Sequence, residues 1–198
     1  MKKENSTYRV AFLGINGALA LVLGFLEHML IPDIPFLPVG AKPGLSNIVT
    51  MYVTDSMGVG GGLCITLIKA AFALITRGAT ASAMSLCGGL LSTVAVAILL
   101  KHRDRLFSFV GIGIVGALMH NFGQLLVACF ISGTPALISY GKYLMIFALI
   151  TGTVTGGMLT LLMPRVERIN SQFAIERRPD EMQNAECRMQ NEGSLRSE

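Results

Sequence analysis

The sequence contains little charge for its length. Only 14% of its 198 residues are Asp, Glu, Lys or Arg, whereas soluble domains carry about 25%. Hydrophobic residues make up 52%, and the mean hydropathy is +0.60. This composition excludes an ordinary soluble domain and predicts a membrane protein.

The charge is concentrated in residues 164–198, a polar tail that we expect to be disordered or a loose cytoplasmic helix. The tail is nearly neutral, so a nucleic-acid partner is not expected.

Cysteine is scarce, and the pattern of the four cysteines does not indicate a metal site. Cys64, Cys87 and Cys129 lie inside apolar segments, and Cys187 lies in the tail. Because no two form a CxxC pair, the sequence favours neither a zinc site nor a disulfide framework. We expect these cysteines to pack as small apolar residues, and we expect no metal and no cofactor.

Six apolar segments predict an all-α polytopic membrane protein, a compact bundle of about six transmembrane helices. The first run, 10–31, follows a basic N-terminal segment, 1–9, and is long enough to cross about 30 Å of hydrocarbon. It is too long for the apolar core of a cleaved signal. The second segment is short for a crossing, so it must pack among its neighbours, start within the preceding loop or insert halfway. The predicted segments are 10–31, 44–54, 59–76, 81–100, 107–132 and 142–163.

Basic residues orient the predicted bundle with both termini inside. This choice places eight lysines and arginines in the cytoplasm and three outside, as the positive-inside rule favours. The inner set is Lys2, Lys3, Arg9, Lys101, Arg103, Arg105, Arg165 and Arg168, and the outer set is Lys42, Arg77 and Lys142.

Two connecting segments have distinctive compositions. The outer loop 32–44 is rich in proline, which breaks helices, and is predicted to be a structured loop or a re-entrant lid. "DSMGVGGG" (55–62) predicts a tight glycine turn between the second and third segments. It lacks the Lys-Ser/Thr of a phosphate-binding loop, so a nucleotide site is not indicated.

Polar residues in the apolar segments are expensive to place in hydrocarbon. The fifth segment contains His120, Asn121 and Gln124 on one half of its helical wheel, together with its small residues. Bulky residues such as Phe122 and Leu126 fall on the other half. The polar trio is therefore predicted to face the protein interior and the bulky side to meet lipid.

The predicted orientation places several polar residues from different helices at similar heights. Their inner neighbours, such as 93–100 and 108–119, contain no ionisable group. The sequence therefore predicts a solute pocket open to the outside and closed beneath. Its candidate residues are Glu27, Asn47, Lys69, Ser85, Gly88, Gly89, His120, Asn121 and Gln124.

Other roles are open for some of these residues. Asn121 can equally well hydrogen-bond a neighbouring helix, a contact worth about 0.6 kcal/mol on average. Lys69 can extend toward the membrane surface or pair with Glu27. His28, near a helix end, is typical of an interfacial position, and no ligand spacing supports a metal between His28 and His120.

Small residues repeat at four-residue spacing in the first and last segments. Gly14 and Ala18, and Ala20 and Gly24, mark the first, and Gly152 and Gly156 mark the last. Such spacing allows close helix packing, either inside the bundle or against another membrane subunit.

Four stretches together resemble the Gx transporter family, long described as heptaprenyl diphosphate synthase component I. They are "GLSNIV" (44–49), "SLCGGLLS" (85–92), "GALMHNFGQLLVA" (116–128) and Glu27 before the proline loop. That family is similar to the substrate-binding (S) components of energy-coupling factor transporters. The resemblance covers about residues 10–163 and implies a multi-pass protein of the bacterial cytoplasmic membrane.

The resemblance also implies partners and roles. S components are six-helix proteins that work with a transmembrane T subunit and two cytoplasmic ATPases. By this resemblance the 32–44 loop is a lid over the pocket, and the small-residue face of the first segment meets a T-like subunit. The small-residue motif of the first segment mixes glycine with alanine, instead of repeating alanine.

The older family description implies isoprenoid chain elongation. Enzymes of that reaction bind magnesium and diphosphate through aspartate-rich motifs, whereas the aspartates here are isolated: Asp33, Asp55, Asp104 and Asp180. We therefore expect no catalytic residues.

The leading functional hypothesis is an S-component-like subunit that captures a small polar solute. The alternatives are a membrane accessory subunit of a prenyl diphosphate synthase and a stand-alone secondary transporter, for which we find no inverted repeat.

Overall fold

The structure is a computed structural model and describes residues 6–30, 44–102, 108–133, 139 and 141–165. Most of the predicted N-terminal segment 1–9 and tail 164–198, and nearly all of the proline loop 32–44, lie outside these residues. Contacts divide the chain into two units, Met1–Leu159 and Thr160–Glu198. The helix packing and the cavity described below belong to the first unit.

The described chain contains six helices, at the positions that the apolar runs predict. α1 spans Ser6–Leu30, α2 spans Leu45–Met57, and α3 spans Val59–Arg77. α4 spans Ala79–Leu100 and α6 spans Phe109–Ser132. A further helix, Gly141–Arg165, follows and is called the last helix below. All but α2 are long and apolar enough to cross a membrane, so the chain is a multi-pass membrane protein.

α2 is the short helix of the bundle. Its 13 residues rise about 20 Å at 1.5 Å per residue, which is less than the hydrocarbon thickness. Much of it is buried, including Val49 and Val53, which form a core cluster with Ala20 of α1 and Ile65 of α3. Of the three sequence interpretations, packing among neighbours is the one that the structure shows. α2 contacts α1, α3 and α4.

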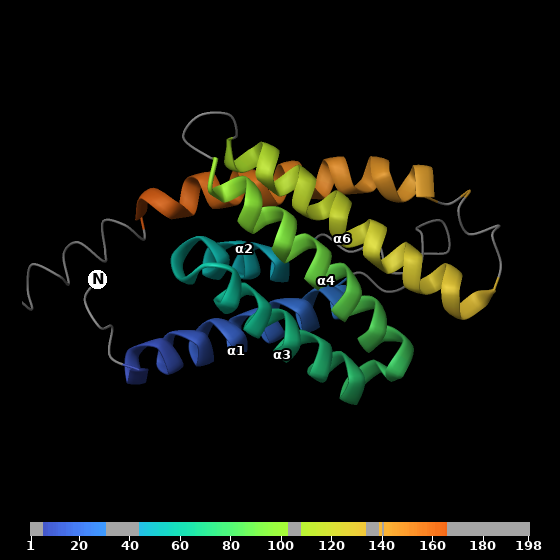
Figure 1. Cartoon of the computed structure of the whole chain (residues 1–198), viewed down its shortest axis with the longest axis horizontal. Coiled ribbons are helices and arrows are strands. Elements are labelled where there is room, and N and C mark those ends of the chain that lie inside the picture. Colours follow the sequence, from blue (N-terminus) through green and yellow to red (C-terminus); the bar gives the residue numbers. More distant parts are fainter. Residues whose placement is uncertain (1–5, 31–43, 103–107, 134–138, 140, 166–198) are drawn as a thin grey trace, which may run out of the picture. The chain divides into compact units, whose positions relative to one another are not determined.

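α4 contacts helices on two sides. Its most extensive contacts are with α6 and then with α3, and Figure 1 shows it between these two helices. Glycines permit the approach to α6. A Cβ on Gly88 would lie 2.6 Å from the carbonyl oxygen of His120, and one on Gly123 would lie 2.7 Å from Cα of Gly88. Any larger residue at either position would force the two helices apart.

The last helix packs on α6 through its four-residue glycine motif. A Cβ on Gly113 of α6 would lie 2.5 Å from the carbonyl oxygen of Gly152 and 2.8 Å from Cα of Gly156. The amide of Asn121 adds a hydrogen bond to the carbonyl oxygen of Leu144, at 3.1 Å. The predicted small-residue motif therefore brings two backbones together inside the bundle.

Single glycines make the turns on either side of α3. Gly58 (φ 76°, ψ −172°) separates α2 from α3, and Gly78 (φ 87°, ψ 179°) separates α3 from α4. Only glycine adopts this conformation readily, because a Cβ would clash with the backbone. The turn predicted over 55–62 contains fewer residues than expected, because Gly60, Gly61 and Gly62 belong to α3.

The fifth predicted segment has the faces that its wheel predicts. Ile112, Gly113, Gly116 and Gly123 are buried, whereas Phe122, Leu126 and Phe130 are exposed. In a membrane these exposed rings and chains meet lipid instead of water.

Candidate functional site

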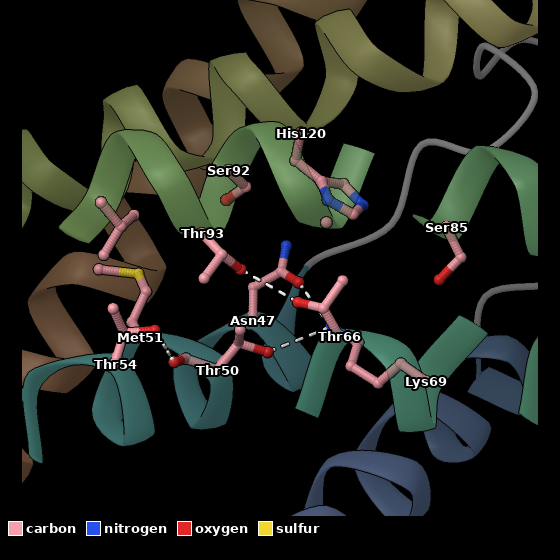
Figure 2. A pocket seen from close by; sticks show the side chains of 12 residues that line it. Asn47, Thr50, Met51, Thr54, Thr66, Lys69, Ser85, Ser92, Thr93 and His120 are labelled. Atoms are coloured by element: carbon pink, nitrogen blue, oxygen red, sulfur yellow. Dashed lines mark hydrogen bonds between the residues drawn. The ribbon is translucent and has the colours of Figure 1, made fainter. Parts of the chain in front are cut away.

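A polar cavity lies between α2, α3, α4 and α6 (Figure 2). Most of its lining residues carry a hydroxyl, amide, ammonium or imidazole group, although the helices around them are apolar. Its volume is about 10 Å³. This is room for roughly one water molecule. The lining residues are Asn47, Thr50, Met51, Thr54, Thr66, Lys69, Ser85, Gly89, Ser92, Thr93, Val96 and His120.

Lys69 of α3 contributes a positively charged side chain to the lining of the cavity. Its ammonium group donates hydrogen bonds to Oδ1 of Asn47, at 2.8 Å, and to Oγ1 of Thr50, at 3.4 Å. Both partners belong to α2 and are uncharged. A lysine in the membrane interior needs such partners, because an isolated charge there costs at least about 2.5–3.5 kcal/mol.

Threonine hydroxyls form another part of the cavity wall. Oγ1 of Thr66 and Oγ1 of Thr93 lie 3.0 Å apart and join α3 to α4. Thr50 and Thr54 donate to carbonyl oxygens four residues earlier in α2, at 3.3 and 2.7 Å. These bonds within one helix satisfy each hydroxyl as a donor, while its oxygen still has lone pairs available.

His120 extends from α6 toward the cavity, as Figure 2 shows. Its Nε2 lies 3.2 Å from the side-chain nitrogen of Gln124. Its Nδ1 and the amide oxygen of Gln124 are buried and have no hydrogen-bond partner in the part of the chain that the structure describes. Rotating the Gln124 amide by 180° would pair its oxygen with Nε2–H of His120 and would leave Nδ1 as an acceptor. In either arrangement Nδ1 keeps an unused hydrogen-bonding capacity.

Glu27 has a different position from the one predicted. Its side chain is 3% exposed but does not line the cavity. Its carboxylate accepts a hydrogen bond from the backbone N–H of Leu45, the first residue of α2. Gly44, the N-cap residue of α2, supplies no side-chain cap, so the carboxylate of Glu27 takes that role. Glu27 also acts electrostatically on Lys69.

The other predicted site residues divide into two groups. Asn47, Lys69, Ser85, Gly89 and His120 come together in the cavity lining. Gly88, Asn121 and Gln124 lie outside it. Gly88 lets α6 approach α4, Asn121 binds the last helix, and Gln124 contacts His120.

The predicted docking residues of α1 also divide. Gly14 and Ala18 are exposed, and a Cβ on Gly14 would have no atom within 4 Å. Ala20 is buried in the core cluster, and Gly24 faces Ser46 of α2. Close packing within the bundle therefore accounts for the second pair, and only the first pair lies on an exposed face.

The sequence prediction missed seven lining residues, most of them threonine or serine. The missed residues are Thr50, Met51, Thr54, Thr66, Ser92, Thr93 and Val96. A periodic signal was present: 47, 50, 51 and 54 follow the i, i+3, i+4, i+7 spacing of one helix face. Positions 85, 89, 92 and 96 of α4 follow a similar spacing.

Comparison with solved structures defines the fold class. The chain resembles a structure of the S component of a bacterial ECF transporter, with a TM-score of 0.59 and 18% sequence identity. The match covers 83% of this chain and 98% of that one. At this identity the likeness shows the fold, which is therefore that of an S component.

Family membership follows from the sequence. The profile of the family described as "Heptaprenyl diphosphate synthase component I" matches residues 17–162, and the chain belongs to this family. The resemblance stated from the four sequence stretches is confirmed. No curated protein matches the chain.

Proposed function

We propose that the chain is the solute-binding subunit of an energy-coupling factor-type importer for a small polar solute. The observation that carries the proposal is the polar cavity between α2, α3, α4 and α6 in a membrane fold similar to that of an S component. Hydrogen-bonding groups from four helices converge there, and polar groups inside a membrane protein commonly serve a substrate.

The small size of the cavity limits how a solute can enter it. Its present volume fits about one water molecule, so a solute enters only if the surrounding helices move. α2 is the short helix, and the bonds from Glu27 to Leu45 and from Lys69 to Asn47 hold its first turn. We expect solute binding to exchange the Lys69–Asn47 bond for bonds to the solute.

Transport energy comes from partner subunits in this proposal. The sequence has no phosphate-binding loop, so the driving force comes from partner ATPases or from an ion gradient. We assign it to a transmembrane T-like subunit and cytoplasmic ATPases. The exposed face around Gly14 and Ala18 of α1 allows another helix to approach closely, because neither residue has a long side chain. We assign T-subunit docking to this face.

Affinity purification from the native membrane tests the proposed function. The tagged full chain is expected to recover an ATPase pair and a T-like membrane subunit, together with a small molecule detected by native mass spectrometry. His120→Ala is expected to lose the small molecule and to retain the subunits. Thr153→Ala, an exposed threonine of the last helix, is the matched control and retains both.

The family description favours a second candidate function, a non-catalytic membrane partner of a prenyl diphosphate synthase. The same purification separates the two. Recovery of a prenyl synthase without ATPases and without a bound solute would support the accessory role and contradict solute capture.

A further inference from the structure

We infer that the cavity recognises its solute through one singly charged, carboxylate-type group, held by Lys69 and Asn47 on one side and by His120 on the other. This inference rests on the proposed function and names the chemistry of the solute. It follows from three properties of the cavity: the kind of hydrogen-bonding capacity left unused, the sign and number of its charges, and its size.

The unused capacity consists largely of donors. The carbonyl oxygen of Asn47 already accepts from Lys69, so the amide of Asn47 offers its N–H groups. Figure 2 shows this nitrogen directed into the cavity, toward the side on which His120 lies. The ammonium group of Lys69 has three donors, of which two are used by Asn47 and Thr50. A solute that fits these groups must accept hydrogen bonds.

His120 supplies the opposite wall. Its Nδ1 is buried and has no hydrogen-bond partner among the described residues, which is unfavourable unless a bound molecule provides the missing bond. The neutral ring can carry its proton on Nδ1 and then donate it to an oxygen in the cavity. Ser85 and Ser92 of α4 line the same space, and their hydroxyls can donate as well.

The one cationic side chain in the described lining favours a solute group with a single negative charge. Lys69 is the one lysine or arginine among the described lining residues, and no aspartate or glutamate is among them. Glu27 acts on Lys69 from outside the lining, and its carboxylate is engaged by the N-terminus of α2. A monoanion therefore gains a charge-assisted bond to Lys69, whereas a dianion would bring a charge with no cation in the described lining to balance it.

Since the helices must move to admit any solute, a compact head group requires the least movement. A planar carboxylate has two acceptor oxygens, which can accept from Lys69 and Asn47 and from His120. A tetrahedral phosphate needs more room and brings more charge. A carboxylate is therefore the head group that best matches this cavity.

Matched acid and amide pairs test this inference, because members of a pair differ mainly in charge. The full-length protein in lipid nanodiscs is unfolded thermally in the presence of acetate or acetamide, propionate or propionamide, and benzoate or benzamide, in constant background buffer. A ligand that binds the native state raises Tm. We expect at least one acid to raise Tm and its amide to have no effect. Inorganic phosphate is expected to stabilise less than that acid.

Two variants assign the effect to the cavity. Lys69→Met is expected to weaken acid binding about tenfold or more, whereas Lys101→Met, an exposed lysine after α4, leaves it unchanged. Ser85→Ala provides a second cavity variant in case Lys69→Met does not fold, and we expect it to weaken binding about threefold.

Several outcomes would overturn the inference. These are equal stabilisation by an acid and its amide, stronger stabilisation by phosphate, acid binding that survives Lys69→Met, and no stabilisation by any acid. Solute capture is judged separately, by the molecule that co-purifies. A neutral co-purified molecule that is lost in His120→Ala would contradict the carboxylate inference and leave the proposed function standing.

Discussion

Two asparagines of the predicted site illustrate how much a single side chain depends on its surroundings. Asn47 and Asn121 both belong to apolar helices and have the same chemistry. Asn47 accepts from Lys69 in the cavity, whereas Asn121 donates to the backbone of Leu144 in the last helix. The sequence alone left the role of Asn121 open, and the hydrogen bond to Leu144 favours the structural one.

Parallel substitutions at these asparagines are expected to separate binding from packing. Asn121→Leu removes one interhelical hydrogen bond, so we expect a loss of about 0.6 kcal/mol in unfolding free energy and unchanged solute binding. Asn47→Leu removes a partner of Lys69 and is expected to reduce binding at least tenfold. Both are measured by thermal unfolding with and without the co-purified solute. Equal binding by the two variants would contradict the assignment of Asn47 to the site.

At the scale of the element, the apolar runs predicted the helices because length and hydropathy decide membrane insertion. The predicted and observed bounds of the third and fourth helices differ by two residues at most.

The extent of the cavity lining was less predictable than the helices. Thr66 and Thr93 extend the polar lining beyond the residues that the sequence singled out. Threonine gives a weak signal because it can satisfy its own hydroxyl within a helix, and so occurs on lipid-facing and buried sides alike.

The turn between α2 and α3 gives a testable prediction about element boundaries. Gly58 and Gly60 both have open space at the position of a Cβ, but only Gly58 has a positive φ. Gly58→Ala is therefore expected to lower the unfolding free energy by about 1–3 kcal/mol through backbone strain. Gly60→Ala, inside helix α3, is expected to be neutral or to stabilise by up to about 1 kcal/mol. Thermal unfolding in nanodiscs measures both, and similar effects would show that Gly58 is not constrained by its conformation.

For the whole molecule, the fold and the family were predictable because several motifs occur together, whereas the sequence alone does not determine the surface that we propose for docking. The four-residue spacing of small residues does not distinguish a contact inside the bundle from a contact with another subunit. Ala20 and Gly24 pack inside, and Gly14 and Ala18 are exposed. Only the neighbouring helices decide between the two, and these come from distant parts of the sequence.

The exposed part of this surface is tested by a bulky substitution. A Cβ at Gly14 has no atom within 4 Å among the described residues, so Gly14→Leu is expected to fold normally and to reduce recovery of the T-like subunit at least fivefold. Gly111→Leu, at an equally open glycine of α6, is the control and is expected to retain the subunit. Quantitative mass spectrometry of the purified complexes gives the ratio. Equal recovery by both variants would remove the α1 face from the docking assignment.

The most direct test of the central claim is the amount of small molecule that co-purifies with a variant whose cavity is filled. Ser92 lines the cavity from α4, so Ser92→Leu would place a bulky apolar chain where the solute is expected to bind. The account predicts that native mass spectrometry finds bound solute on the wild type and on the exposed-site control Thr153→Leu, and at least tenfold less on folded Ser92→Leu. Solute bound equally to all three proteins would show that the cavity between α2, α3, α4 and α6 is not the capture site.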